Sequence, residues 1–355
     1  MATEHEKLDF GVVVYSSSEY VEDFLAERLE SHFTRVEFIP KRLDEHSAKF
    51  AEGFDSVCLF VNDLCNEEVV NMLASYGVKL IAMRCAGFDR VDLKAAASHG
   101  MRIVRVPSYS PRSVAEGGLA LMLMIARNLR SAVLKVAVGN YTVNGLVGME
   151  LTGKTFGIIG TGKIGVEMIK VLRGFDGRIL AYDVYQSEEA KSLGATYTDL
   201  ETLLKESDIV SLHTPLLPST RNIINKERLK MMKQDALLVN ISRGGLIDTK
   251  ALIETLQYGD DGLQTTGGKL RAVAMDVYEG EDSLFFEDFT RLSASERMKA
   301  WDNQFVTLKS LPQVVITPHI AFLTDEALGN IGDTTLSNLV AYATGEELVN
   351  EVKAQ

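Results

Sequence analysis

A short stretch near the middle of the chain has the residue types that bind a phosphate. Residues 156–165 read FGIIGTGKIG, an apolar run followed by three glycines in G-x-G-x-x-G spacing. Gly160 suits a tight turn, Gly162 lets the backbone approach a pyrophosphate, and Gly165 lets a helix and a strand pack closely. A helix that begins here offers free N–H groups and a positive dipole end to phosphates. The alternative is a structural turn that binds nothing.

The surroundings of this turn favour the interpretation that it binds a dinucleotide. The turn follows a predicted strand, Thr155–Ile159, and precedes a helical pattern of apolar residues. Asp183 ends the next predicted strand, Arg178–Tyr182, where its carboxylate can accept hydrogen bonds from a ribose diol. The same charge would repel a 2′-phosphate, and residues 184–186 (VYQ) offer no arginine to accept one. The pattern therefore predicts NAD rather than NADP as the cofactor.

Polar clusters follow four more predicted strands: SLHTP (211–215), NISRGGLID (240–248), MDVYEGE (275–281) and TPHIA (317–321). The carboxyl ends of parallel strands share one edge of a sheet, and ligands bind there. Arg243, Glu281 and His319 are therefore expected to converge, although they are far apart in the sequence.

These three residue types make a coherent site for reducing a carbonyl beside a carboxylate. Arginine can hold a carboxylate bidentately and polarise a carbonyl. Histidine can pass a proton near neutral pH, and a neighbouring carboxylate favours its charged form. Taken singly, Arg243 also fits a salt-bridged arginine, His319 a capping residue and Glu281 an ordinary loop carboxylate. His213 fits the wall of a cofactor pocket better than a proton donor, and Asp276 fits a helix cap as well as a ribose contact.

Strand-like and helix-like segments alternate along the chain, which predicts an α/β protein with parallel sheets. Because a second series of such segments precedes the glycine turn, we expect a separate doubly wound domain before the cofactor domain. One long apolar helix is expected over Ser113–Leu134, and its excess of apolar residues suggests a contact between subunits. The predicted strands are Gly11–Tyr15, Val36–Phe38, Ser56–Val61, Leu80–Arg84, Arg102–Val106, Thr155–Ile159, Arg178–Tyr182, Asp208–Leu212, Leu237–Asn240, Arg271–Met275 and Val314–Thr317.

Composition excludes several function classes. The 355 residues carry a net charge of -12 without a basic run, which argues against nucleic-acid binding. No apolar stretch is long enough for a membrane span, and the first residues do not form an apolar signal segment, so we expect a cytoplasmic protein. Cys58, Cys65 and Cys85 fit reduced thiols better than disulfides, and their spacing fits no zinc site; no metal is expected.

At this point the motifs resemble those of the D-2-hydroxyacid dehydrogenase family, and within it most the fermentative D-lactate dehydrogenases. The resemblance covers nearly the whole chain. It lies in LIAMRCAGFDRVDL (80–93), VRVPSYSPRSVAE (104–116), the glycine turn, SLHTPL, NISRGGLID, MDVYEGE with LFFED after it, and TPHIAFLT.

The resemblance implies two doubly wound parallel-sheet domains, a Rossmann cofactor domain (110–322) inserted in a flavodoxin-like substrate domain (1–109 plus 323–355). It implies reduction of a small 2-oxo acid by NADH to the D-2-hydroxy acid, pyruvate to D-lactate above all, by a homodimer or a dimer of dimers. Its catalytic residues fall on Arg243, Glu281 and His319. Its substrate contacts fall on Ala86, Gly87, Tyr109, Arg243 and His319. Its cofactor contacts fall on Gly160, Thr161, Gly162, Lys163, Ile164, Gly165, Asp183, His213, Thr214, Pro215, Thr220, Ile241, Ser242, Arg243 and Asp276.

Two rival functions stay open at this point. One is the same reaction on a bulkier 2-oxo acid such as phenylpyruvate, and the other is an NAD(H)-sensing protein without turnover. The chain also departs from the family pattern. Gly117 stands where members often have histidine, Asp89-Arg90 replace a common Asn-Asn or Asp-Asn, and Tyr258–Lys269 is an insertion.

Overall fold

The computed structural model describes residues 6–257 and 269–353, which fall into two compact units. The first comprises residues 1–110 and 323–355, and the second residues 111–322. These limits differ by one residue from the expected domains. The Tyr258–Lys269 insertion lies, apart from its last residue, outside the described residues. No helix in the described ranges has both the length and the apolar character of a membrane span.

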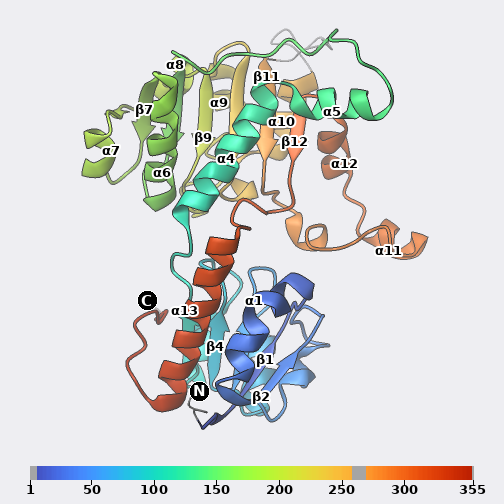
Figure 1. The fold of residues 1–355 in the computed structure, drawn as a ribbon, viewed down its shortest axis with the longest axis vertical. Coiled ribbons are helices and arrows are strands. Elements are labelled where there is room, and N and C mark those ends of the chain that lie inside the picture. Colours follow the sequence, from blue (N-terminus) through green and yellow to red (C-terminus); the bar gives the residue numbers. More distant parts are fainter. Residues whose placement is uncertain (1–5, 258–268, 354–355) are drawn as a thin grey trace, which may run out of the picture. The chain divides into compact units, whose positions relative to one another are not determined.

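The first unit is a five-stranded parallel sheet with strand order β2-β1-β3-β4-β5, the flavodoxin-like order. Helix α13 returns from the far end of the sequence and packs against α1, β4 and β5 (Figure 1). The elements of this unit are β1 (Leu8–Val14), α1 (Glu19–Glu30), β2 (Phe33–Phe38), η1 (Ala48–Ala51), β3 (Ser56–Leu59), α2 (Glu67–Ser75), β4 (Leu80–Met83), α3 (Leu93–Ser98), β5 (Arg102–Arg105) and α13 (Asp325–Thr344).

The second unit is a seven-stranded parallel sheet in the order β12-β11-β10-β9-β6-β7-β8. Counted from β6, this is the 3-2-1-4-5-6 dinucleotide-binding order with one strand added at the far edge. Its elements are α4 (Pro111–Ala126), α5 (Leu129–Ala137), β6 (Thr155–Ile159), α6 (Lys163–Leu172), η2 (Arg173–Phe175), β7 (Arg178–Tyr182), α7 (Glu188–Ser192), β8 (Thr196–Tyr197), α8 (Leu200–Glu206), β9 (Ile209–Leu212), α9 (Lys226–Met231), β10 (Ala236–Asn240), η3 (Gly244–Leu246), α10 (Thr249–Gln257), β11 (Leu270–Met275), η4 (Glu281–Ser283), α11 (Ala294–Lys299), α12 (Asn303–Ser310) and β12 (Val314–Ile316).

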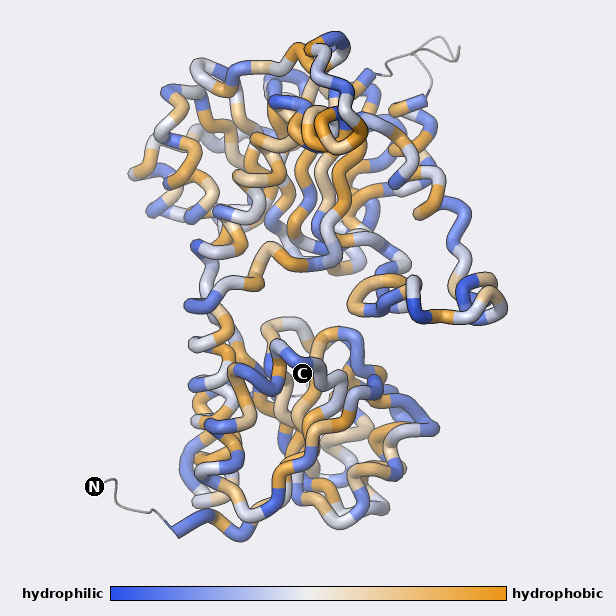
Figure 2. Tube along the Cα trace, turned by 45° about the vertical axis from the view of Figure 1, so that its right-hand side comes forward, coloured by the Kyte–Doolittle hydropathy of each residue, from blue (hydrophilic) through white to orange (hydrophobic). Residues whose placement is uncertain are grey.

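Buried strands explain why the sequence shows continuous apolar runs instead of alternation. Strands β3, β4, β9 and β10 are buried at every position, as expected for parallel strands covered by helices on both faces. Hydrophobic residues accordingly dominate the central strands of the second unit in Figure 2. The two parallel sheets confirm the predicted α/β fold class, and every predicted strand overlaps an observed one.

Two local predictions were wrong. The long helix expected over Ser113–Leu134 is two helices, because the chain breaks between α4 and α5 where Asn128 adopts the left-handed conformation (φ 52°). The strand β8 was not predicted at all, since two residues are too few to show a periodic pattern.

Candidate active site

The glycine turn lies where the order of the second sheet reverses direction. Strand β6 pairs with both β7 and β9, so the turn after β6 faces the end of β9, the expected position of a ligand crevice. Gly160 has φ +96°, and a Cβ there would lie 2.7 Å from the carbonyl carbon of His213. A Cβ on Gly165 would lie 2.0 Å from the carbonyl oxygen of Gly160. Neither position accepts a side chain, which accounts for two of the three glycines.

The third glycine leaves the start of helix α6 open. Gly162 is the N-cap residue, it makes no side-chain cap, and a Cβ there would meet nothing within 4 Å. The first N–H groups of a helix have no intrahelical partner and bind anions well. An uncapped helix start with an open approach fits the pyrophosphate of a nicotinamide dinucleotide. Lys163 and Ile164 are the first two residues of this helix.

The carboxylate of Asp183 lies beside this turn. Its Oδ2 accepts hydrogen bonds from the backbone N–H of Thr161 (2.6 Å) and from the Thr161 hydroxyl (3.2 Å). Its Oδ1 accepts one from the backbone N–H of Tyr185 (3.2 Å). A carboxylate has about four acceptor positions, so Oδ1 keeps capacity for another donor such as a ribose hydroxyl.

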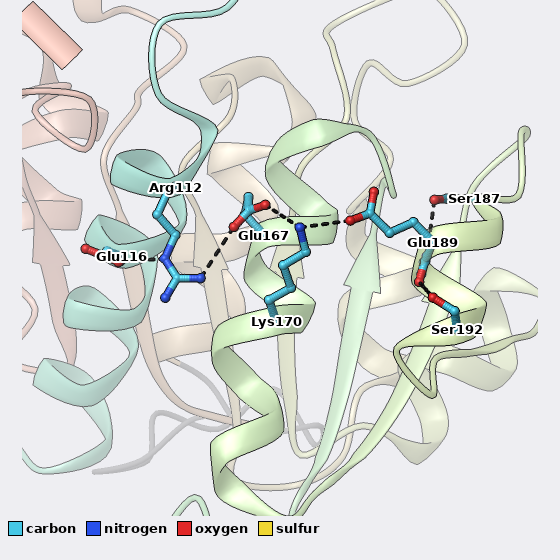
Figure 3. A network of polar contacts seen from close by, with 8 residues as sticks. Arg112, Glu116, Glu167, Lys170, Ser187, Glu189 and Ser192 are labelled. Atoms are coloured by element: carbon cyan, nitrogen blue, oxygen red, sulfur yellow. Dashed lines mark hydrogen bonds and ion pairs between the residues drawn. The ribbon is translucent and has the colours of Figure 1, made fainter. Parts of the chain in front are cut away.

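An ion-pair network borders the outer side of the turn (Figure 3). Arg112 pairs with Glu116 and Glu167, and Lys170 pairs with Glu167 and Glu189, so the charges link α4, α6 and α7. The hydrogen bond from Lys170 holds the pKa of Glu167 below its ordinary value. Exposed pairs of this kind add little stability. The network borders a cavity of about 370 Å³ lined by Pro111, Thr161, Gly162, Lys163, Val166, Glu167, Ser187 and Glu189.

The end of β9 contributes two side chains with unused polar atoms. Both ring nitrogens of His213 and the hydroxyl of Thr214 are buried and have no hydrogen-bond partner among the described residues. Burial lowers the pKa of His213 from 6.5 to about 3, so the ring is neutral at working pH. A neutral wall of the cofactor pocket fits these properties, and a proton donor does not. Beyond it, the Thr220 hydroxyl donates to the carbonyl oxygen of Pro215 (2.7 Å) and closes a turn.

The loop after β10 holds Arg243 through contacts of its backbone. The Asn240 side-chain amide donates to the carbonyl of Arg243 (2.9 Å), and the Ser242 hydroxyl donates to the carbonyl of Thr214 (2.6 Å). A Cβ on Gly244 would lie 2.0 Å from the carbonyl carbon of Tyr278. The arginine loop can therefore pack directly on the segment that leads to Glu281 only because residue 244 is glycine. Ile241, in the same loop, is buried against α4 and α6 beside Gly118.

Glu281 and His319 form a hydrogen-bonded pair. The Nδ1 atom of His319 lies 2.8 Å from Oε1 of Glu281, and the other carboxylate oxygen accepts the backbone N–H of Tyr278 (2.8 Å). The two side chains are only 16% and 12% exposed, so water screens their interaction weakly. His319 also has φ 58°, a conformation that costs energy in a residue other than glycine and is concentrated at functional sites.

Asp276 holds the histidine loop in this conformation. Its Oδ1 accepts the Thr317 hydroxyl (2.6 Å) and the Ile320 N–H (2.8 Å), and its Oδ2 accepts the Ala321 N–H (2.8 Å). The residue is 1% exposed, and burial raises the pKa of its carboxyl above the ordinary value although these donors oppose the shift. The sequence left Asp276 open between a cap and a ribose contact, and the family resemblance implied a cofactor contact; among the described residues its carboxylate bonds to the loop of His319.

Comparison with known proteins identifies the family of this arrangement. The family model described as D-isomer specific 2-hydroxyacid dehydrogenase, NAD binding domain, matches residues 119–321. The chain belongs to this family. Its matched residues form the NAD-binding dehydrogenase domain, which carries the turn, the arginine loop and the Glu281–His319 pair.

Several relatives match this dehydrogenase over most of its length. The solved structure of the pyruvate reductase of Chlamydomonas reinhardtii is 47% identical, with a TM-score of 0.90 over 97% of this chain and 99% of that one. The D-lactate dehydrogenase of Escherichia coli is 42% identical over 96% of this chain and 99% of its own. The aromatic 2-oxoacid reductase of Clostridium sporogenes is 38% identical over 88% and 90% of the two chains.

The substrate residues that the resemblance implied outside the NAD-binding domain lie in the first unit, after β4 and β5. The Arg105 side chain donates to the carbonyl of Ala86 (2.9 Å), and the Cys85 thiol donates to the carbonyl of Gly87 (3.2 Å). Asn330 of α13 donates to the carbonyl of Tyr109 (2.6 Å). The Ala86-Gly87 loop and the Tyr109 segment are thus fixed through their backbones.

Two residues near the candidate site were not assigned a role from the sequence. Phe286, in the LFFED segment, has φ 63°, and its ring centroid lies 6.4 Å from that of His319. Tyr197 of β8 donates a hydrogen bond to Thr161 in the glycine turn. The LFFED motif pointed toward the first of these, whereas no pattern in the sequence marks the second. The family departure at Gly117 also has a physical counterpart, since a Cβ there would lie 3.0 Å from Ala321 in the histidine loop.

Proposed function

We propose that this dehydrogenase uses NADH to reduce a small 2-oxo acid to the D-2-hydroxy acid, with pyruvate and D-lactate as the principal pair. The Glu281–His319 hydrogen bond of 2.8 Å carries the proposal. A histidine braced by a shielded carboxylate is suited to hold a proton and deliver it to a developing alkoxide. The D configuration of the product is taken from the family.

Each residue has a defined part in the proposed reaction. The Arg243 guanidinium holds the substrate carboxylate and polarises the neighbouring carbonyl. His319 donates its proton to the carbonyl oxygen, and Glu281 stabilises the charged ring before transfer. Bound NADH supplies the hydride. The family resemblance also assigns substrate contacts to the backbone N–H groups of the Ala86-Gly87 loop and to Tyr109.

An NADH-oxidation assay over a series of 2-oxo acids tests this function. We expect pyruvate to be reduced with a higher kcat/KM than phenylpyruvate or 2-oxoisocaproate. Arg243→Lys keeps the charge but loses the planar fork, so we expect a large loss of kcat/KM with the Kd for NADH little changed. Near-normal pyruvate reduction by Arg243→Gln would contradict the role of Arg243.

A bulkier substrate is the second candidate, and the Clostridium sporogenes relative favours it, since that protein is an aromatic 2-oxoacid reductase. A kcat/KM for phenylpyruvate above that for pyruvate would decide for this alternative. An NAD(H)-sensing protein without turnover would instead bind NADH and reduce none of the acids.

We further propose that the active form is a homodimer or a dimer of dimers built on α5. None of the residues of α5 is buried, and the segment after it is equally apolar and exposed. Arg130 nevertheless anchors the helix to the carbonyls of Leu311 and Val314 (3.2 and 2.6 Å), so a fixed apolar surface faces outward. A second copy would cover it through a two-fold contact. The exposed side chains are Leu129, Val133, Leu134, Val136, Val138, Tyr141, Val143 and Val147.

Light scattering at micromolar concentration tests this assembly. We expect a dimer or larger species for the natural chain, and Val133→Glu with Leu134→Glu should yield monomers. A monomeric natural chain would contradict the proposal.

The cysteines bear on the compartment of the enzyme. All three are buried and unbridged, which fits a reducing environment, and we propose that the enzyme is cytoplasmic.

A further inference from the structure

A chain of hydrogen bonds that lies outside the glycine motif ends on Asp183. The backbone N–H of Ser187 donates to the Tyr197 hydroxyl (2.7 Å), and that hydroxyl donates to Oγ1 of Thr161 (2.7 Å). The Thr161 hydroxyl donates in turn to Oδ2 of Asp183 (3.2 Å). The chain thus joins β8 and the start of α7 to the turn and to the carboxylate at the end of β7.

The groups at the two ends of this hydrogen-bond chain determine the donor and the acceptor in each of its hydrogen bonds. A backbone N–H can only donate, and an ionised carboxylate can only accept. The Tyr197 hydroxyl must therefore accept from Ser187 and donate to Thr161, which leaves the Thr161 hydroxyl free to donate to Asp183. Hydrogen bonds aligned in one direction polarise one another. Removing the central hydroxyl would deprive Ser187 of its acceptor and Thr161 of its donor.

This chain of hydrogen bonds determines which oxygen of Asp183 is available to a ligand. Thr161 occupies Oδ2 with two hydrogen bonds, while Oδ1 accepts only the Tyr185 N–H. A ribose 2′-hydroxyl would therefore find its acceptor on Oδ1. A carboxylate held in this orientation also presents its charge to a 2′-phosphate without turning away.

We propose that Tyr197 is a positioning residue that, through Thr161, orients the Asp183 carboxylate and so sets the selectivity for NADH over NADPH. This inference rests on the proposed role of Asp183 as the ribose contact. Tyr197 itself touches neither the glycines nor the start of α6 in any described hydrogen bond, so its effect passes through the carboxylate.

The surroundings of Tyr197 allow its hydroxyl to be removed cleanly. Its ring lies over Lys191 (5.8 Å), a contact that phenylalanine keeps. Helix α7 also contacts α6 through ion pairs that do not involve Tyr197, because Lys170 bridges Glu167 and Glu189 (Figure 3). Tyr197→Phe should therefore fold with an unchanged arrangement of these helices.

The test is the binding of both cofactors to the whole enzyme, measured by the fluorescence of bound NADH and NADPH. In Tyr197→Phe we expect the Kd for NADH to rise about fivefold, the worth of one ordinary hydrogen bond. The Kd for NADPH should change less than about twofold, because a loosened carboxylate also repels the 2′-phosphate less. Thermal melting checks the fold. Tyr342→Phe, which makes the same chemical change at a half-buried tyrosine of α13 in the first unit, is the matched control and should change neither Kd.

A double-mutant cycle tests the route through Thr161. Since the effect of Tyr197 requires the Thr161 hydroxyl, the cofactor selectivity of Thr161→Val should not fall further when Tyr197→Phe is added. Additive effects would overturn the route. Equal weakening of NADH and NADPH in Tyr197→Phe, or no change in either, would overturn the inference and leave the proposed function intact. A natural enzyme that binds both cofactors equally would overturn the role of Asp183 and the inference with it.

Discussion

Asp183 and Asp276 both follow a strand of the same sheet, β7 and β11, but their carboxylates have opposite surroundings. The hydrogen bonds of the Asp276 carboxylate go to the loop of residues 317–321, and the residue is 1% exposed. Asp183 is half-buried, and one of its oxygens accepts a single backbone N–H. Both carboxylates accept three hydrogen bonds, so the difference lies in burial. A fully buried carboxylate stabilises the local backbone, whereas a half-buried one can also contact a ligand.

This difference distinguishes Asp183 from Asp276, which occupy similar positions in the sequence pattern. Both aspartates follow an apolar strand, and both matched cofactor positions of the family pattern. Their partners distinguish them, and the partners of Asp276 lie more than forty positions along the chain. The predictions below test the distinction, from the largest expected effect to the smallest.

Replacing His319, the proposed proton donor, should have the largest effect on activity. In His319→Gln we expect kcat/KM for pyruvate to fall about 10³-fold at every pH, because a positioned acid contributes on the order of 10²–10⁴. The Kd for NADH and the free energy of unfolding should stay close to those of the natural enzyme. Steady-state kinetics and urea denaturation measure the two quantities. A loss of less than tenfold would show that another group donates the proton.

Removing the carboxylate of Asp276, which binds the loop of residues 317–321, should mainly lower the free energy of unfolding. In Asp276→Ala one buried and two part-buried donors lose their acceptor, so the free energy of unfolding should fall by about 3 kcal/mol. Activity should fall as well, since the loop that carries His319 loses these three hydrogen bonds. The matched control is Asp183→Ala, for which we expect less than about 1 kcal/mol. Equal losses in the two variants, measured by urea denaturation, would remove the distinction between the aspartates.

The glycine turn could be predicted from the sequence because its determinants are neighbours. Gly160, Gly162 and Gly165 act on the turn that they form, and the flanking apolar runs announce the strand and the helix. The break at Asn128 could not be predicted in the same way, because the apolar pattern continues across it. The left-handed conformation of one residue leaves no periodic signal.

The sequence predicted only part of the proposed catalytic site. Strand ends in a parallel sheet share an edge, which predicts that Glu281 and His319 approach each other, and the structure places them 2.8 Å apart. The inward hydrogen bonds of Asp276 and the hydroxyl chain from Tyr197 depend on tertiary packing. Neither the spacing nor the residue type of these two positions reveals those contacts.

His213, which follows β9 at the same edge of the sheet, gives a pH-dependent test. Burial lowers the pKa of His213 to about 3, against 6.5 as its ordinary value. Below pH 6.5 the unfolded chain takes up a proton on this ring and the folded one does not. The ring therefore lowers stability as the pH falls from 6.5 toward 3, by up to about 1.4 kcal/mol per pH unit.

Comparing the natural chain with His213→Asn isolates this contribution. Urea denaturation between pH 4 and pH 7 should show a shallower loss of stability in the variant, while the two curves run parallel above about pH 7. Parallel curves throughout the range would mean that the ring titrates normally in the folded enzyme. The His213 ring would then be accessible to water in the folded enzyme, like the exposed groups at this edge of the sheet.

The smallest effect should appear at the open aspartate, and only in the choice of cofactor. The charge of Asp183 should make the natural enzyme prefer NADH over NADPH by at least about tenfold, because roughly 1.4 kcal/mol of repulsion suffices. In Asp183→Ala we expect this preference to narrow to within about threefold, through weaker NADH and stronger NADPH binding. The kcat with saturating NADH should change little, since the residue contacts neither Arg243 nor His319 in any described hydrogen bond. The measurement is kcat/KM with each cofactor at saturating pyruvate. A preference that survives in Asp183→Ala would place cofactor selectivity elsewhere, and an Asp183 that resembles Asp276 in its effect on stability would be a structural residue as well.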